Sequence, residues 1–308
     1  MKQNIILGDC LEYLKFIEDE SVDLIIADPP YWKVVGEKWD YQWRTEQDYI
    51  DWSIKWITEA SRVLRKGGSF YLFGYFRTLA LLVPYFDTLG LELRQQIMID
   101  KGMRAVSGRA TKNYKMFPNV TESCLFIIKD SKPFIKKTLK ERQKALKLSS
   151  KEINEALGVA SYGGGMWSIY TGNNICEQVP TFELWEKLQE ILQFNIPYEK
   201  ITQTFNAQMG ITDVWRDIDF YQEKRFHPTQ KPMKLIKRLI QASSNENDVV
   251  LDPFGGSGTT ALSCLALNRQ FITIELDENY HQIIVERVKE TVEPQGMFNH
   301  HLPKLIQV

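Results

Sequence analysis

Short apolar runs alternate with amphipathic helical stretches along most of this chain of 308 residues. The runs have the length and composition of buried strands, and residues with helical spacing follow them. They lie at 4–8, 22–27, 69–74, 91–99, 122–129, 249–251 and 270–275. Because parallel neighbours need a long crossover connection, strands that alternate with helices favour a parallel sheet. The sequence therefore predicts an α/β fold with an open, mostly parallel sheet.

One stretch interrupts this alternation. Helices are expected over 46–65, 78–89, 232–243, 259–267 and 277–290. We expect Lys66-Gly67-Gly68 to end the first of them. From 148 to about 221 the pattern is helical and polar, without a buried strand. Residues 1–147 and 222–292 are therefore expected to form the two halves of one domain, with 148–221 inserted between them and 293–308 as a C-terminal tail.

Charge is distributed unevenly along the chain. The formal net charge of −1 does not indicate a nucleic-acid partner. Between Lys101 and Lys147, however, the sequence contains thirteen Lys and Arg residues but only three acidic residues. This stretch therefore carries a net charge of +10, and the remainder of the chain carries −11. A local basic surface on an acidic protein suits a polyanion. A solvated charged helix around 136–147 is the alternative interpretation for about half of this charge.

Several classes of protein are disfavoured. No apolar run reaches the roughly 18 residues that span a bilayer, and the start MKQNIILGDC does not have the shape of a signal peptide. The four scattered cysteines form no C-x-x-C pair, which indicates reduced thiols in a cytoplasmic protein. His300-His301 is interpreted as part of a solvated tail, and no metal site is expected.

The strand at 22–27 runs directly into Asp28-Pro29-Pro30-Tyr31-Trp32. The two prolines fix the backbone in an extended exit and donate no N–H group. The carbonyls of Asp28 and Pro29 then have no partner in the sheet. Acceptors beside an aromatic ring suit a planar ligand ring that bears an amino group. A plain turn at a strand end is an equally good explanation of this stretch taken alone.

A second strand end carries a glycine loop. The strand at 249–251 leads into Asp252-Pro253-Phe254-Gly255-Gly256-Ser257-Gly258, and a helix is expected from Thr259. Glycines let the backbone approach a ligand and leave N–H groups at a helix N-terminus. Glu275 follows Asp252 by 23 residues, the position of an acid that binds ribose hydroxyls. No Gly-Lys-Ser/Thr follows the loop, so a nucleoside triphosphate is disfavoured.

The two special strand ends are expected at the same edge of the sheet, because ligands of α/β proteins bind at the carboxyl ends of the strands. A nucleoside cofactor and an amino-bearing ring would then be neighbours. This arrangement favours a group transfer between them.

Four motifs together carry a resemblance to a known family. Asp28-Pro29-Pro30-Tyr31 resembles the catalytic motif of amino-directed DNA methyltransferases, and Asp252–Gly258 resembles their S-adenosylmethionine loop. His227-Pro228-Thr229-Gln230-Lys231-Pro232 resembles the block before that loop, and Gly8-Asp9-Cys10 a segment near the cofactor adenine. The order of the motifs is similar to that of the permuted beta group of these enzymes. The resemblance covers about 1–130 and 225–290.

The resemblance implies a Rossmann-like sheet, S-adenosyl-L-methionine as the cofactor and double-stranded DNA as the substrate. The target amine would attack the methyl group directly, from a base flipped out of the duplex. The implied catalytic residues are Asp28, Pro29, Pro30 and Tyr31, with Tyr31 stacking on the base. The implied cofactor-binding residues are Asp9, Cys10, Asp28, Lys231, Asp252, Phe254, Gly255, Gly256, Ser257, Gly258, Thr259 and Glu275.

Within this set the resemblance gives three residues separate roles. Glu275 would hold the ribose, Asp9 the adenine amino group and Lys231 the methionine carboxylate. The Asp-Pro-Pro-Tyr motif favours the N6 amine of adenine over the N4 amine of cytosine, which stays open. Methylation of RNA or protein is less favoured, as is a DNA-binding regulator with an inactive methylase core.

The inserted segment resembles helix-turn-helix repressor domains in its order of elements. Ser149–Val159 is expected to form a capped helix and a glycine turn, and a helix from Pro180 follows a second short one. Gly163-Gly164-Gly165 departs from that pattern, because glycines weaken a recognition helix. We expect the segment to recognise the target DNA sequence. The alternative interpretation, that it is a subdomain that only supports the fold, is nearly as well favoured. The candidate DNA contacts are Trp32, Arg104, Arg109, Lys112, Lys115, Tyr162 and Trp167.

The expected context is a restriction-modification system, an orphan methylase or a phage. A cognate restriction endonuclease and a homodimer are left open as partners.

Overall fold

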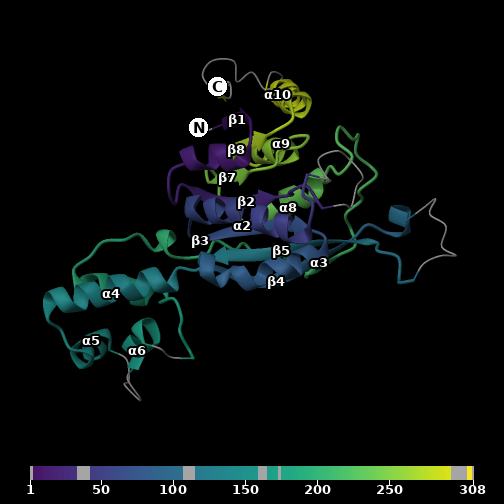
Figure 1. Ribbon diagram of the computed structural model, residues 1–308. Coiled ribbons are helices and arrows are strands. Elements are labelled where there is room, and N and C mark those ends of the chain that lie inside the picture. Colours follow the sequence, from purple (N-terminus) through teal and green to yellow (C-terminus); the bar gives the residue numbers. More distant parts are fainter. Residues whose placement is uncertain are drawn as a thin grey trace. The chain divides into compact units, whose positions relative to one another are not determined.

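The computed structural model describes residues 3–32, 42–106, 115–158, 165–172 and 175–292, together with the backbone of 304–306. The chain divides into two compact units, shown in Figure 1. Residues 1–129 and 204–308 make up the first, which we call the sheet unit, and residues 130–203 make up the second, which we call the helical unit.

The sheet unit is organised around one twisted sheet. Its strands in chain order are β1 Gln3–Leu7, β2 Val22–Ala27, β3 Leu64–Gly74, β4 Leu91–Asp100, β5 Thr121–Lys129, β6 Val214–Trp215, β7 Val249–Asp252, β8 Gln270–Glu275 and β9 Lys304–Ile306. Among the described residues they are arranged as β6-β4-β5-β3-β2-β7-β8-β1-β9. β5 runs antiparallel to β3 and β4, and the other pairings are parallel. The prediction of an open, mostly parallel α/β sheet is confirmed.

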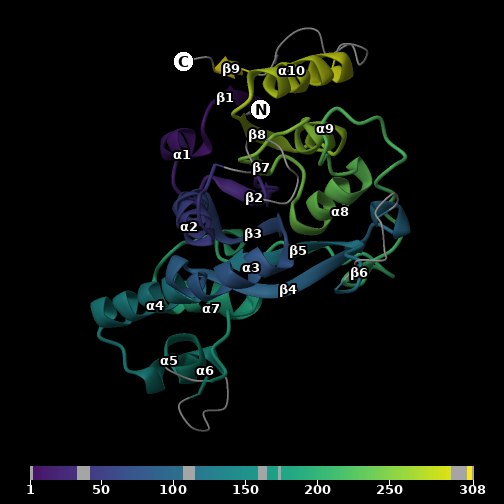
Figure 2. The same ribbon diagram turned by 45° about the vertical axis from the view of Figure 1, so that its right-hand side comes forward.

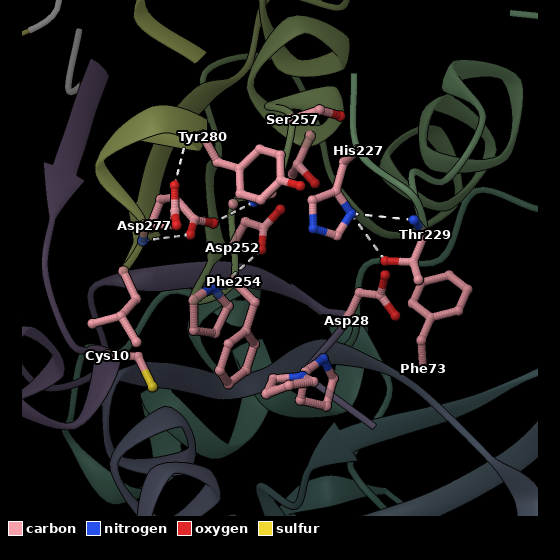
Figure 3. A pocket seen from close by; sticks show the side chains of 18 of the residues that line it. Cys10, Asp28, Phe73, His227, Thr229, Asp252, Phe254, Ser257, Asp277 and Tyr280 are labelled. Carbon is pink, nitrogen blue, oxygen red and sulfur yellow. Dashed lines mark hydrogen bonds between the residues drawn. The ribbon is translucent and has the colours of Figure 1, made fainter. Parts of the chain in front are cut away.

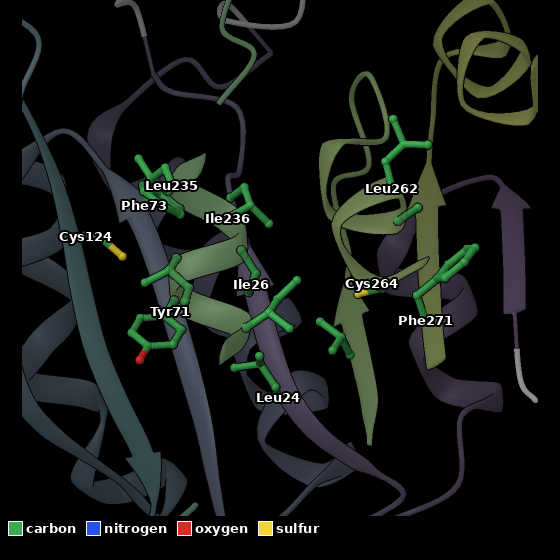
Figure 4. Close-up of a cluster of buried hydrophobic side chains, with 14 of the residues drawn as sticks. Leu24, Ile26, Tyr71, Phe73, Cys124, Leu235, Ile236, Leu262, Cys264 and Phe271 are labelled. Carbon is green, nitrogen blue, oxygen red and sulfur yellow. The ribbon is translucent and has the colours of Figure 1, made fainter. Parts of the chain in front are cut away.

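Helices cover both faces of this sheet, as the views of Figures 1 and 2 show. One face carries α1 Cys10–Tyr13, α2 Glu46–Val63 and α3 Phe76–Leu82, and the other carries α8 Met233–Ser243, α9 Thr259–Ala266 and α10 Glu278–Val292. Successive strand residues alternate between the two cores: Ile25 packs with the α2 side and Ile26 with the α8 side. Figure 4 shows the second core, with Ile26 and Phe73 of the sheet near Leu235 and Ile236 of α8.

Two expected helices end earlier than the sequence suggests. α2 ends at Val63, and β3 begins at Leu64 without a glycine cap. Gly67 has φ +71 and lies within β3, where the pairing with β2 shifts register. Lys66-Gly67-Gly68 is therefore an irregularity of the strand and not the helix end that we expected. The helix expected over 78–89 is replaced by α3 and two 3-10 turns, Val83–Tyr85 and Asp87–Leu89, because Pro84 cannot continue an α-helix.

The helical unit contains α4 Lys132–Leu146, α5 Ser150–Leu157, α6 Gly165–Thr171 and α7 Phe182–Leu192. Their apolar faces form one separate core around Trp185 and Trp167. The capped helix predicted from Ser149 is confirmed: Ser149 and Glu152 make a reciprocal capping box, and Gly158 ends α5 at φ +72.

The unit boundaries differ from the expected insertion of 148–221 at both ends. α4 belongs to the helical unit, and residues 204–221 belong to the sheet unit. Within these residues, β6 pairs with β4 and buries Trp215, so the expectation that no buried strand occurs before 221 is wrong. A two-residue strand is too short to show a period in the sequence.

The C-terminal stretch expected as a tail contains β9, which pairs in parallel with β1. His300 and His301 lie outside the described residues. Across the described ranges, none of the helices combines the length and the apolar character that crossing a bilayer requires.

Candidate active site

The carboxyl ends of β2, β7 and β8 surround one cavity of about 340 Å³ in the sheet unit. This volume lies in the range of small-molecule sites. Both predicted strand ends contribute to its lining, and Figure 3 shows Cys10 and Asp277 at one end of the pocket and Asp28 and Phe73 at the other. The expected juxtaposition of the two motifs is therefore present.

On the Asp28 side of the pocket, the chain leaves the sheet after β2 through Pro29 and Pro30. β2 ends at Ala27, and the phenol of Tyr49 on α2 donates a hydrogen bond of 3.0 Å to the carbonyl of Pro30. This contact fixes the extended exit against the helix that covers it. Asp28, Pro29, Pro30 and Tyr31 all line the pocket.

Two carboxylates and two lysines form a charged cluster on this side. Lys231 Nζ lies 2.7 Å from Asp28 Oδ2 and 3.5 Å from Glu122 Oε1. Lys101 Nζ lies 2.9 Å from Glu122 Oε2. The phenol oxygen of Tyr31 lies 2.8 Å from Asp28 Oδ1 and 2.7 Å from Glu122 Oε1. Glu122 and Lys231 are 8% and 6% exposed, so they meet in a largely dry environment.

The lysines decide the charge state of this cluster. Burial by itself raises the pKa of Glu122, but the nearby Lys231 and Lys101 outweigh it and hold that pKa at about 2. Burial lowers the pKa of Lys231, yet Asp28 and Glu122 raise it above its usual value. Burial, Asp28 and Glu122 together raise the pKa of the Tyr31 phenol. Glu122 is thus held as a carboxylate, Lys231 as an ammonium group and Tyr31 as a neutral phenol.

The glycine loop forms the other side of the pocket. Gly255 packs so closely that a Cβ there would lie 2.6 Å from Thr273 Oγ1, which explains the need for glycine. The N–H groups of Gly255 and Gly256 donate to the Ile274 carbonyl at 2.8 Å and to Glu275 Oε2 at 2.6 Å. The N–H of Gly258 donates to the Gly255 carbonyl at 2.8 Å. These three N–H groups are therefore bonded within the protein, while Gly255 and Gly256 line the pocket.

The acids beside the glycine loop are buried without a comparable counter-charge. The carboxylate of Glu275 accepts the N–H of Gly256 on Oε2 and the N–H of Asp277 on Oε1, the latter at 2.8 Å. Burial raises the pKa of Glu275 to about 7, although these two backbone donors partly oppose it. Burial also raises the pKa of Asp252 to about 6, although hydrogen bonds from Thr260 and the Phe254 N–H partly oppose it. Both acids line the pocket.

The His227–Pro232 block connects the two sides. Gln230 Oε1 accepts the Ser257 hydroxyl at 3.0 Å and the Phe226 N–H at 3.0 Å, so it ties the block to the glycine loop. The His227 ring packs against the ring of Tyr280 with centroids 4.3 Å apart. Lys231, the next residue after Gln230, then reaches Asp28.

Most of the predicted site residues line this pocket. They are Asp9, Cys10, Asp28, Pro29, Pro30, Tyr31, Lys231, Asp252, Phe254, Gly255, Gly256, Ser257, Thr259 and Glu275. Gly258 is not among the lining residues and acts as the N-cap of α9 with φ +81. Lys231 pairs with Asp28, which differs from the cofactor carboxylate that the resemblance implied for it. Asp9 lines the pocket and also caps α1 by accepting the Leu11 N–H at 2.8 Å.

Four of the candidate DNA contacts lie in the part of the chain that the structure describes. Trp167 is 4% exposed in the core of the helical unit, so its expected role as a surface contact is wrong. The indole of Trp32 donates to the Trp43 carbonyl at 3.1 Å and packs against the sheet core. Arg104 and Lys115 are exposed. Arg109, Lys112 and Tyr162 lie outside the described residues.

Sequence reasoning missed Glu122 and Lys101. Both sit where the antiparallel strand β5 begins and β4 ends, so they reach the edge to which the parallel strands point. An acid at the start of an otherwise apolar strand was the available signal for Glu122. The sequence did not show that β5 is antiparallel, and this direction is what brings Glu122 to the pocket edge of the sheet.

Comparisons with known proteins agree with this geometry. The DNA methylase family of N6 and N4 type matches residues 22–286. The chain is 32% identical over 294 residues to DNA adenine methyltransferase YhdJ of Escherichia coli, which covers 93% of this chain and 82% of that protein. It is 30% identical over 286 residues to type II methyltransferase M.BamHI of Bacillus amyloliquefaciens, which covers 92% of this chain and 56% of that protein.

Solved structures share the fold. The M1.HpyAVI–SAM complex is similar with a TM-score of 0.54 and 22% identity, over 93% of this chain and 100% of that one. The cytosine-N4-specific PvuII DNA methyltransferase is similar with a TM-score of 0.56 and 14% identity, over 95% and 94%. Since the family match spans both special strand ends and most of the chain between them, this chain belongs to the N6/N4 DNA methylase family and is a DNA methyltransferase.

Proposed function

We propose that this chain transfers the methyl group of S-adenosyl-L-methionine to the N6 amine of an adenine flipped out of double-stranded DNA. The observation that carries the proposal is one pocket lined by both Asp28 and Glu275. One carboxylate suits an amine and the other suits a ribose, so both reactants fit side by side.

The residues beside the glycine loop fit the nucleoside part of this cofactor. Each oxygen of Glu275 accepts one backbone N–H, and a carboxylate oxygen has a second lone pair for a ribose hydroxyl. The carboxylate of Asp9 lines the pocket within reach of the same region and suits the adenine amino group. When bound, S-adenosylmethionine supplies an electrophilic methyl group on a sulfonium sulfur.

The Asp28 side prepares the amine. Asp28 and the carbonyl of Pro29 accept hydrogen bonds from the exocyclic nitrogen, which leaves its lone pair directed at the methyl carbon. Lys231 Nζ lies 2.7 Å from Asp28 Oδ2 and holds this acceptor in place. Burial raises the pKa of the Cys10 thiol, so this pocket cysteine is unsuited to covalent catalysis. The transfer is direct: as the amine nitrogen bonds to the methyl carbon, the carbon–sulfur bond breaks and S-adenosylhomocysteine leaves. The proton that the methylated amine loses passes to Asp28, its hydrogen-bond acceptor, and from there to solvent.

A base stacked within a duplex cannot reach a pocket at the ends of strands, so the proposal includes base flipping. The ring of Tyr31 lines the Asp28 side and is proposed to stack on the flipped base, while Phe73 beside it is fully buried. Adenine is supported by the similarity to YhdJ, whose name states that it is an adenine methyltransferase. Cytosine N4 is the second candidate, because the family contains both types.

The helical unit is proposed to contribute to DNA binding. Lys137, Lys140 and Lys144 are exposed and recur every three or four residues along α4, which places them on one face, and the exposed Lys147 is the C-cap of this helix. We call them the α4 lysine face; it suits a phosphate backbone. The seven residues of α6 are all buried or half-buried, so α6 is poorly suited to be the recognition helix of the helix-turn-helix resemblance. Lys136 and Arg142 instead donate to carbonyls of Gly172 and Leu192.

The test is methylation of defined DNA with labelled S-adenosylmethionine, followed by digestion to nucleosides and identification of the modified base. N6-methyladenine is expected. N4-methylcytosine would select the second candidate, and label in RNA or protein but not in DNA would reject the substrate. A chain that neither binds the cofactor nor transfers label would be the inactive regulator. Sequencing the methylome of cells that express the chain gives the modified base together with its recognition sequence.

A further inference from the structure

Glu122 has no part in the proposed transfer so far, yet it sits at the centre of the charged cluster. It begins β5, whose antiparallel direction brings its first residues to the edge where β2 ends. Its side chain shares a sheet face with Cys124, the face that α8 covers. Lys231 lies two residues before that helix and approaches Glu122 Oε1 to 3.5 Å.

The Tyr31 phenol is shared between two acceptors. Its oxygen is 2.8 Å from Asp28 Oδ1 and 2.7 Å from Glu122 Oε1, but a phenol has one hydrogen and donates it to one acceptor at a time. Lys231 and Lys101 keep Glu122 ionised, so this carboxylate supplies no second hydrogen. The two carboxylates therefore compete for one hydrogen.

The competition matters for the proposed amine site. A target amine must donate to Asp28, whose Oδ1 is the oxygen that Tyr31 also approaches. If Tyr31 lost its acceptor when the amine arrived, a buried hydroxyl would be left unpaired at a substantial cost. Glu122 Oε1 is already within 2.7 Å and removes that cost.

We propose that Glu122 is a positioning residue of the methyl-transfer site: it takes over the Tyr31 hydrogen bond and so frees Asp28 Oδ1 for the target amine. This inference rests on the proposed function. Through Lys231, which it also contacts, Glu122 holds the second oxygen of Asp28 in place. Glu122 itself does not touch the reacting atoms.

A double-mutant cycle tests this role by single-turnover methyl transfer with saturating cofactor and DNA. Glu122→Gln keeps the shape but is a weaker acceptor, so Tyr31 stays on Asp28, and the rate should fall about tenfold to a hundredfold, the worth of a hydrogen bond to a charged group. Tyr31→Phe should cost only a few-fold, because the ring remains and the competing donor is gone. The double variant should be at least as fast as Glu122→Gln alone.

A purely structural role of Glu122 would give a different rate for the double variant. If Glu122 only supports the fold, the losses of the two single variants multiply, and the double variant is the slowest; this overturns the inference. Glu92→Gln, a glutamate on neighbouring β4 that pairs with Arg94, is the matched control and should retain the wild-type rate. Thermal unfolding of each variant checks that it is folded. A Glu122→Gln variant with the wild-type rate also overturns the inference but leaves the proposed function standing, whereas a wild-type chain that transfers no methyl group rejects both.

Discussion

The two sides of the pocket hold their buried acids in opposite ways. At the end of β2, Asp28 and Glu122 lie within 3.5 Å of lysine ammonium groups, and the pKa of Glu122 is held at about 2. At the ends of β7 and β8, Asp252 and Glu275 are bound by backbone N–H groups, and burial raises their pKa values to about 6 and about 7.

This difference indicates two kinds of task. A carboxylate that is paired in advance keeps a fixed charge and orientation, which suits a group that must accept from a neutral amine. A buried acid without a lysine is destabilised until a ligand brings donors, which suits the binding of ribose hydroxyls. The first side is organised for the transfer and the second for cofactor binding.

The largest expected effect follows from replacing Asp28. Asp28→Asn keeps the size but removes the charge that holds the amine and pairs with Lys231. The single-turnover rate should fall by about 10³-fold, as when a preorganised group is removed from an active site. Cofactor affinity, measured by calorimetry, should change less than about threefold if the two sides act separately. Asp51→Asn, on the exposed face of α2, is the control. A comparable loss of cofactor affinity would contradict the separation.

Glu275→Gln should give the reverse pattern. The amide loses the charge that binds ribose hydroxyls, so cofactor affinity should fall about tenfold to a hundredfold. With saturating cofactor, the transfer rate should stay within about threefold of the wild type, because the Asp28 side is intact. Titration of cofactor in the single-turnover assay separates the two effects. If the variant bound the cofactor normally but transferred the methyl group slowly, Glu275 would act in the transfer and not in cofactor binding, which would contradict the comparison.

The raised pKa of Glu275 also predicts a dependence of stability on pH. Its folded value of about 7 lies above its ordinary value of 4.5, so the folded state favours the protonated acid. The stability from this group is therefore fully present below pH 4.5 and is lost as the pH rises through 7. Relative to Glu275→Gln, the unliganded wild type should lose about 2 kcal/mol of unfolding free energy between pH 5 and pH 8. Urea unfolding at both pH values measures this, and parallel changes in the two proteins would refute it.

The smallest effect on the pocket is expected from the α4 lysine face. Changing all four lysines to Gln should weaken DNA binding on the order of tenfold near 0.15 M salt and reduce the salt dependence of binding, because fewer counterions are released. The transfer rate with saturating DNA should not change, since neither side of the pocket is altered. The controls are Gln at four exposed lysines elsewhere: Lys15, Lys55, Lys187 and Lys289. Equal losses in both sets would show an effect of net charge alone.

Much of the sheet and both pocket motifs could be predicted from the sequence. Buried strands can be recognised in the sequence by their apolar runs. Asp28, Glu275 and the glycine loop follow such runs, and the predicted parallel sheet places the carboxyl ends of these strands at one edge. The direction of β5 was not predictable, because this antiparallel strand is buried on both faces and has the continuous apolar run that is typical of a parallel strand. Glu122 was therefore counted only as a charge, although the fold brings it to Tyr31.

Other differences arise where two local signals compete. Lys66-Gly67-Gly68 has the composition of a helix end but lies inside β3, because the pairing with β2 continues past it. Trp167 and Lys231 were assigned by motif, and their contacts depend on tertiary packing: one fills the core of the helical unit and the other pairs with Asp28. The motifs singled out these two residues but did not show which side chains they contact in the folded protein.

The central claim is that one pocket holds the cofactor at Glu275 and the target amine at Asp28. A crystal structure of the chain with S-adenosylhomocysteine tests it most directly. We expect the ribose hydroxyls to bind the carboxylate of Glu275 and the sulfur to lie toward Asp28, with Lys231 still paired to Asp28. A product bound with its ribose away from Glu275, or with its carboxylate on Lys231 in place of Asp28, would contradict the account.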